Sequence, residues 1–164
     1  MLPARVELLQ QMPIFGAVRE DALQVLLEPT RSVQVAAGGY FFHERDPANC
    51  MYVLESGRAA VLKEWQGHQL LLHHLDPGDC FGEMAMLDLY PRSAAVRAVS
   101  DCRAIELGPG DLLRLFERDC EQFALIHMNL GREMCRRLRI TDEMLFQARM
   151  GDEPAAARDG FRTL

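Results

Sequence analysis

Long apolar runs are missing from this sequence. No segment approaches the ~20 consecutive apolar residues that a membrane-spanning helix requires. The first ten residues contain Arg5 and Glu7 and lack the apolar stretch of a secretory signal peptide. We therefore expect a cytoplasmic protein with no membrane partner. The 164 residues are 49% hydrophobic and 26% charged, which is typical of one globular domain with a sizeable core.

Lysine is nearly absent, because Lys63 is the only one and arginine supplies the other positive charges. The formal net charge is −6, whereas a nucleic-acid-binding domain usually carries a basic patch. One basic cluster does exist, made of Arg132, Arg136, Arg137 and Arg139. Such runs are common on solvated helix faces, and we interpret this one as paired with Glu133 and Asp142. The charge balance gives no reason to expect a DNA partner.

Patterns for catalysis or metal binding are also missing. The five cysteines are odd in number and widely spaced, which fits neither a disulfide framework nor a zinc site. We interpret them as reduced, mostly buried small hydrophobic residues. The histidines have no metal-ligand spacing, and no Gly-Lys-Ser/Thr ending marks a triphosphate-binding loop. Since no nucleophile-and-base arrangement is evident either, we expect neither a metal ion nor an enzyme.

The hydrophobic pattern does change along the chain, and it divides the chain into regions. Residues 1–29 have the spacing of helices interrupted by Pro13. Residues 30–107 consist of short apolar or alternating runs separated by Gly, Pro and Asp, which predicts an antiparallel sandwich or barrel. The predicted strands are 32–36, 40–43, 51–55, 59–63, 69–75, 94–99 and 103–107. The fold class is therefore α+β.

Helix is predicted again over 108–149. Pro109 suits a first helical turn, and Asp111 lies near the positive end of the helix dipole. Asp119 and Gln122 have the spacing of a capping box, which predicts a long helix from about Cys120 to Arg149. Gly151 and Pro154 are expected to end it. Residues 150–164 are predicted to form a flexible tail.

Segment 76–98 has the residues to bind a phosphate beside a ribose. Gly82 allows the backbone to approach a ligand closely. The amides of Met84 and Ala85, at the start of a short helical turn, are free to bind an anion. Arg92 offers a planar fork of donors that fits a phosphodiester. Glu83 is an acceptor for a sugar hydroxyl.

This segment resembles the phosphate-binding cassette of cyclic nucleotide-binding domains. Phe-Gly-Glu at 81–83, Ala85 and Pro-Arg-Ser-Ala at 91–94 fall at the family spacing without a gap. The resemblance implies a β-roll (a double-stranded β-helix, jelly-roll-like) flanked by helices. It also implies the ligand-binding roles. Glu83 would bind the ribose 2′-hydroxyl with support from Gly82, and the phosphate would bind Arg92, the Ser93 hydroxyl and the amides of Met84 and Ala85.

The resemblance extends over residues 1–149, and one departure lies in a turn. Segments 12–15, 38–39 and 52–57 resemble the family's N-terminal helices and early strands, but many members have glycine where this chain has Arg45. About fifteen residues follow the long helix, too few for the helix-turn-helix domain of the transcription-factor members. We therefore expect a sensor domain without a DNA-binding module, which acts on an unknown protein effector or its own oligomer.

The long helix is expected to serve the ligand and a second chain. The resemblance implies that Thr141 and Asp142 lie at the base, and it favours cyclic AMP over cyclic GMP as the ligand. Asp142 has an alternative role as a solvent-facing partner of Arg139. Six residues spaced three and four apart would form one stripe along this helix, and the stripe predicts a homodimer. They are His127, Leu130, Met134, Leu138, Thr141 and Leu145. The helix could instead pack on its own roll.

Two other functional readings stay open. In one of them the roll has no ligand and serves only as a dimerisation or interaction module. In the other, because some relatives of the fold bind haem, a Cys/His axial site is an alternative.

Overall fold

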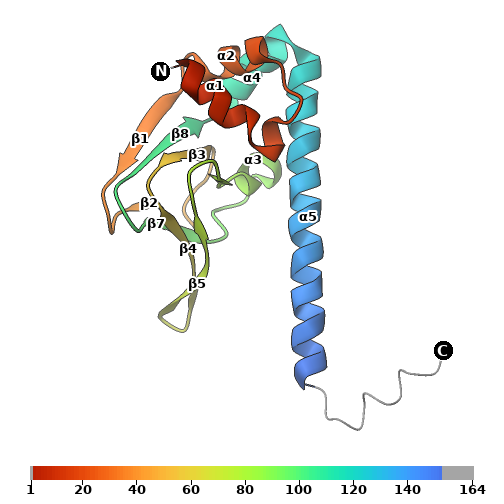
Figure 1. The fold of residues 1–164 in the computed structure, drawn as a ribbon. Coiled ribbons are helices and arrows are strands. Elements are labelled where there is room, and N and C mark those ends of the chain that lie inside the picture. Colours follow the sequence, from red (N-terminus) through yellow and green to blue (C-terminus); the bar gives the residue numbers. More distant parts are fainter. Residues whose placement is uncertain (1, 153–164) are drawn as a thin grey trace, which may run out of the picture. The chain divides into compact units, whose positions relative to one another are not determined.

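A computed structural model describes residues 2–152, which form helices and two four-stranded sheets (Figure 1). The chain divides into two compact units between Asn129 and Leu130, and each unit is described by itself. The first unit holds every strand and most of the helices. The second unit consists, in its described part, of the remainder of the last helix, α5 (Cys120–Asp152). The α+β class with antiparallel strands is confirmed.

Each sheet joins strands that are distant in sequence. The first sheet has the order β1 (Arg31–Val35), β8 (Cys102–Leu107), β3 (Met51–Ser56) and β6 (Cys80–Phe81). The second has the order β2 (Tyr40–Phe42), β7 (Ala95–Ala98), β4 (Ala59–Trp65) and β5 (His68–Leu75). All pairs within them are antiparallel. Strand β6 was not predicted, because two residues are too few to show an alternating pattern.

The core of the roll lies between the two sheets. Leu54 and Ala104 from the first sheet and Val61 and Val96 from the second are buried in one cluster. Inward residues alternate with outward ones along each strand, so a half-buried strand needs only every second position to be apolar. Small residues such as Ala104, which is fully buried, allow the sheets to approach closely.

The first unit also contains helices on either side of the strands in sequence. Pro13 ends α1 (Leu2–Gln10) and opens a short 3₁₀ turn, after which α2 (Glu20–Leu27) packs against α1. Helix α4 (Pro109–Arg118) starts as predicted, with the Gly108 amide donating to Asp111 Oδ2 at 2.7 Å, and it packs against α2.

The start of α5 is fixed by hydrogen bonds to the N-terminal segment. The Gln122 amide donates to Asp119 Oδ1 at 3.1 Å, which is one half of the predicted capping box. The Gln122 side chain accepts from the Arg19 amide at 2.8 Å instead of completing that box. The buried Asn129 Nδ2 donates to the carbonyl oxygens of Ile14 (3.1 Å) and Gly16 (2.9 Å). These bonds hold the first turns of α5 within the first unit.

The far end of α5 lies beyond the predicted one. The helix continues past Arg149 and through Gly151 to Asp152. A single glycine costs a helix only roughly 1 kcal/mol relative to alanine, which does not end a helix of this length. Pro154 and the rest of the predicted tail, 153–164, lie outside the described residues. No helix within 2–152 is both long and apolar enough to cross a membrane.

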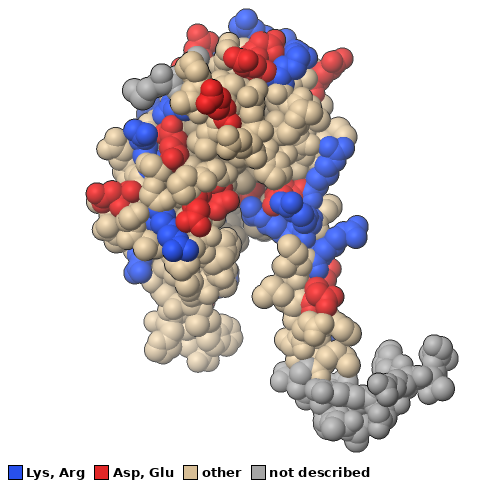
Figure 2. All heavy atoms as spheres, viewed as in Figure 1, with Lys and Arg blue, Asp and Glu red and all other residues tan. Residues whose placement is uncertain are grey.

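The second unit carries the arginine cluster on an exposed helix surface, where Figure 2 shows blue side chains gathered along α5. Arg136 and Arg137 both pair with Glu133, the latter at 3.3 Å. Burial alone would raise the pKa of Glu133, but the two guanidinium groups outweigh it and lower the pKa. The cluster is therefore a solvated and internally paired helix face, as predicted for Glu133.

Candidate functional site

Arg92 is the centre of the predicted site, and it is buried. Its side chain lies in the loop before β7 and the residue is only 5% exposed. Nη1 donates to the Gly82 carbonyl oxygen at 3.0 Å, and Nη2 donates to Cys50 Sγ at 3.3 Å. The guanidinium carbon lies 4.1 Å from the centre of the Phe42 ring, which is a cation–π contact. Four segments of the chain therefore meet at one cation.

One donor of this guanidinium has no acceptor. Among the described residues, Arg92 Nε is buried and makes no hydrogen bond. A buried unpaired donor costs about 1–3 kcal/mol, and more for a charged group. An anion placed beside Nε would satisfy this donor and balance the charge. The donor set therefore fits a phosphate or a similar anion.

Gly82 is required by the position of Arg92. Its φ is 75°, in the left-handed region that favours glycine. A Cβ added here would lie 2.4 Å from Arg92 Nη1, which is closer than any real contact. The sequence predicted that this glycine admits a ligand to the backbone. The structure shows in addition that it admits the Arg92 side chain.

The helical turn α3 (Met84–Asp88) follows directly after Gly82. Glu83 is its N-cap residue, 2% exposed, and the Glu83 carbonyl accepts from the Met86 amide at 3.0 Å. Amides in the first turn of a helix have no intrahelical acceptor, so those of Met84 and Ala85 can bind an anion. The Ser93 hydroxyl lies 3.8 Å from Met84 Sδ. The structure thus gathers the predicted residues of 82–93.

The turn with the family departure is in contact with Arg92. Arg45 has a φ of 70°, and its amide donates to the Arg92 carbonyl oxygen at 2.8 Å. The Arg92 amide in turn donates to the Asp46 carbonyl oxygen at 3.0 Å. The Asp46 carboxylate also accepts from the His43 amide at 2.7 Å. This turn is remote from the cassette in sequence, but it fixes the backbone that carries Arg92.

A second support holds the backbone one residue further on. Lys63 on β4 donates to the Ser93 carbonyl oxygen and pairs with Glu44 at 2.7 Å. The Lys63 hydrogen bond, followed by one from the Glu64 amide, lowers the pKa of the Glu44 carboxyl. The lone lysine of the sequence therefore links the turn at Glu44 to the cassette at Ser93.

Thr141 and Asp142, the predicted base contacts, lie in the second unit. Both are exposed on α5, and the Thr141 hydroxyl donates to the Arg137 carbonyl oxygen at 3.0 Å. This is the usual back-bond of a helical threonine. Their predicted role depends on the resemblance.

Sequence reasoning missed three residues that surround the Arg92 guanidinium. Phe42, Cys50 and Tyr52 lie before the cassette, and Tyr52 has its ring 5.8 Å from the Arg92 guanidinium carbon. Burial, with a hydrogen bond to Cys50, raises the pKa of the Tyr52 phenol. Aromatic residues on adjacent predicted strands were the only available signal, and that signal is shared with any core residue.

The cysteines are only partly as predicted. All five are free thiols, but Cys120 and Cys135 are exposed and Cys50 is half-buried, so burial holds fully for Cys80 and Cys102 alone. The two exposed cysteines lie on α5, where apolar and polar residues are mixed, so the sequence pattern did not show which positions face solvent. Within residues 2–152, no group of three His, Cys, Asp or Glu side chains could hold a metal ion.

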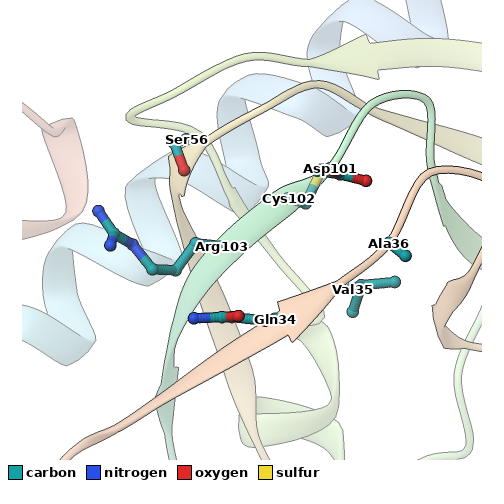
Figure 3. Close-up of a pocket in the computed structure, with 7 residues that line it drawn as sticks. All are labelled: Gln34, Val35, Ala36, Ser56, Asp101, Cys102 and Arg103. Atoms are coloured by element: carbon teal, nitrogen blue, oxygen red, sulfur yellow. The ribbon is translucent and has the colours of Figure 1, made fainter.

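A separate hollow lies on the first sheet, away from the cassette (Figure 3). It measures about 530 Å³, and β1, β8 and the end of β3 line it. Asp101 there accepts from the Ala37 amide at 2.9 Å, and Arg103 lies 3.4 Å from the Glu55 carboxylate. The two charged groups of the hollow are thus used within the fold, and none of the predicted site residues lines it.

Comparison with known proteins decides the family. Residues 32–119, more than half of the chain, match the model of the cyclic nucleotide-binding domain. The chain belongs to this family. The matched range includes the whole cassette, both sheets except the first residue of β1, and α4, which confirms the resemblance drawn from 81–94.

Relatives of this cyclic nucleotide-binding domain come from fungi, bacteria and a protozoan. It is 35% identical over 107 residues to a cAMP-dependent protein kinase regulatory subunit of Hypocrea atroviridis, covering 65% of this chain and 22% of the relative. It is 29% identical over 149 residues to a CRP-like cAMP-activated global transcriptional regulator of Mycobacterium tuberculosis, covering 90% and 65%. The chain thus spans less than two thirds of either relative.

A solved structure agrees with the fold. The regulatory domain of Toxoplasma gondii PKA, crystallised with cAMP, has a TM-score of 0.66 and 28% identity to this chain. The similarity covers 70% of this chain and 44% of that one.

The left-handed turn gives a test of stability. We expect Arg45→Gly to raise the free energy of unfolding by about 1 kcal/mol, because glycine adopts a positive φ without the steric cost paid by other residues. Urea denaturation measures the change. Arg45→Ala is the matched control, since it removes the same exposed side chain but keeps Cβ. A glycine variant no more stable than the alanine variant would contradict the assigned backbone strain.

Proposed function

We propose that this chain binds a cyclic mononucleotide, cyclic AMP in preference to cyclic GMP, and acts as a sensor and not as a catalyst. The unpaired Nε of Arg92, a buried residue of the cassette, carries this proposal. A cyclic nucleotide has one negative charge on its phosphodiester, which matches one guanidinium. Support for cyclic AMP comes from the relatives, whose names specify cAMP, and from the similar regulatory domain crystallised with it.

The proposed contacts follow the order of the cassette. The phosphate accepts from Arg92, from the Ser93 hydroxyl and from the amides of Met84 and Ala85. The Glu83 carboxylate, 2% exposed and held at the N-cap of α3, accepts from the ribose 2′-hydroxyl. Charge-assisted hydrogen bonds of this kind are about twice as strong as neutral ones. Removing one partner then leaves a buried charge uncompensated.

Arg92→Ala is expected to weaken cyclic AMP binding by at least about a hundredfold, because the phosphate loses the guanidinium that balances its charge. Isothermal titration calorimetry measures the affinity, and circular dichroism shows that the variant has folded. Arg92→Lys keeps the charge but loses the planar pair of donors, so its affinity should lie between those of Arg92→Ala and the unmodified protein. Arg97→Ala is the control, since Arg97 is an exposed arginine on β7 in the same segment. Equal affinities of Arg92→Ala and the unmodified protein would exclude Arg92 as the anchor.

The base is proposed to contact α5 at Thr141 and Asp142, as the family resemblance implies. The threonine hydroxyl can accept from the adenine amino group or bond to guanine, whereas the carboxylate accepts only and favours the two adjacent donors of guanine. Contact with the ligand would favour one position of the helix over others, and binding would thereby become a signal to an effector.

Substitutions on α5 test this reading. We expect Thr141→Ala to weaken cyclic AMP binding by roughly tenfold through one lost hydrogen bond, and Asp142→Ala to change the ratio of the cyclic AMP and cyclic GMP affinities. Glu143→Ala is the control, because Glu143 is the next residue on the same exposed helix. If all three variants keep both affinities, selectivity belongs to the β-roll alone.

A homodimer through the second unit is also proposed. Of the predicted stripe, Leu130 is fully buried in the single chain, whereas Leu138 (60%) and Leu145 (51%) are exposed. Ile140, Met144 and Phe146 nearby are exposed as well, each by more than half. A helix of a single chain rarely leaves this much apolar surface in water. A second copy of the same helix would cover it by coiled-coil-like packing.

Light scattering is expected to report a dimer at micromolar concentration, and Leu138→Glu combined with Leu145→Glu is expected to shift it to a monomer, because burying two carboxylates opposes association. The matched control is Leu113→Glu, an equally exposed leucine (54%) on α4. A monomeric unmodified protein at high micromolar concentration would refute the dimer.

A further inference from the structure

Cys50 holds one of the donors that the proposed phosphate would use. It lies directly before β3, half-buried, with its Sγ 3.3 Å from Arg92 Nη2. The Tyr52 ring lies 5.8 Å from the Arg92 guanidinium carbon, and burial together with the neighbouring Cys50 raises the pKa of its phenol. The same guanidinium carries the unpaired Nε, and Arg92 as a whole is only 5% exposed. The fold therefore places this sulfur against a buried cation with one unpaired donor.

The other cysteines lie in different surroundings. Cys80 and Cys102 are buried, and the Cys102 thiol donates to the carbonyl oxygens of Ser100 (3.2 Å) and Arg58 (3.3 Å). Burial raises the pKa of Cys102, which keeps this thiol protonated and inert. Cys120 and Cys135 are exposed on α5. Cys50, in contrast, has its sulfur 3.3 Å from Nη2 of Arg92 in the cassette.

We propose that Cys50 is an oxidation site for hydrogen peroxide, and that its sulfinate product occupies Arg92 in place of the nucleotide phosphate. This inference rests on the proposed function of the same site. In the first step, the sulfur attacks one peroxide oxygen, the O–O bond breaks, and the products are a sulfenic acid and water. A second peroxide oxidises the sulfenic acid to the sulfinic acid and releases a second water. Each step transfers two electrons from sulfur to peroxide.

The sulfinate resembles the phosphodiester in the features that Arg92 recognises. Both groups carry one negative charge shared by two terminal oxygens, which suits the parallel donors of a guanidinium. In the reduced protein, the sulfur accepts from Nη2 and leaves Nε unpaired. Two added oxygens supply acceptors for both nitrogens and for the Tyr52 hydroxyl. The buried cation is then neutralised by the chain itself, and a nucleotide phosphate meets an occupied site.

The relation is mutual, because ligand and oxidant compete for the same space. A phosphate bound at Nη2 and Nε covers the sulfur and limits access of peroxide. We therefore expect saturating cyclic AMP to slow the oxidation of Cys50, while oxidation of the exposed Cys120 and Cys135 continues at its usual rate.

The test uses the full chain with Cys120→Ser and Cys135→Ser, which removes the two exposed thiols. Peroxide-treated and reduced samples are titrated with cyclic AMP, and peptide mass spectrometry counts the oxygens on Cys50. We expect oxidation to lower the affinity by at least about tenfold, the effect of losing one charge-assisted contact. The same protein with Cys50→Ser added, compared with its own untreated sample, is expected to keep its affinity after peroxide. Methionine oxidation is thereby controlled.

A permanent mimic gives a second readout that does not need peroxide. Cys50→Asp places a carboxylate with two oxygens and one charge beside Arg92, and Cys50→Asn is its neutral match in size. We expect the aspartate variant to bind cyclic AMP at least about tenfold more weakly than the asparagine variant. Thermal melting in the absence of ligand is expected to favour the aspartate variant, because its carboxylate pairs with the buried cation.

The outcomes separate this inference from the function on which it rests. Full oxidation of Cys50 with unchanged affinity, resistance of Cys50 to peroxide, or equal affinities of the aspartate and asparagine variants would each overturn the inference and leave the proposed function standing. An equal loss of affinity in the Cys50→Ser protein would also overturn it. Failure of the reduced protein to bind any cyclic nucleotide would overturn both.

Discussion

A buried guanidinium with one unpaired donor is the constraint on which the rest of this site depends. Removing a charged group from water is expensive, so the surrounding chain must compensate with hydrogen bonds and ring contacts. The Gly82 carbonyl, the Phe42 ring and the Cys50 sulfur provide that compensation from three directions. The turn at 43–46 fixes the Arg92 backbone on both sides. What remains uncompensated is one nitrogen, where we propose that the phosphate binds.

Strand register places these groups together. Pairing of Tyr52 with Phe81 on β3 and β6 brings Cys50 and Gly82 to the same edge of the first sheet. Pairing of Phe42 with Val96 on β2 and β7 brings the Phe42 ring toward the loop that carries Arg92. The aromatic side chains then pack on one another, with the Tyr52 and Phe81 ring centres 5.3 Å apart. The site is therefore a product of both sheets and not of the cassette alone.

How much of this the sequence could predict depends on whether the relevant residues are contiguous. Gly82, Glu83 and Arg92 fall within one short segment, so their spacing alone predicted an anion site. Phe42 and Cys50 could not be assigned to it, because their roles depend on a strand register that the pattern does not specify. The two-residue β6 was missed because two residues are too few to show an alternating pattern. Helix starts were predictable from local caps, whereas the end of α5 was not, since one glycine only weakens a helix.

The pairings of β3 with β6 and of β2 with β7 join segments that are tens of residues apart, and contacts of this kind form late in folding because loop closure must come first. The surroundings of Arg92 cannot form in a partly folded chain, since Phe42, Cys50 and Gly82 lie in or next to different strands. During synthesis, it can be completed only after β7 has left the ribosome. If the chain binds an anion as proposed, this binding is gained in one step with closure of the roll, and a chain that lacks β7 is expected to lose it completely.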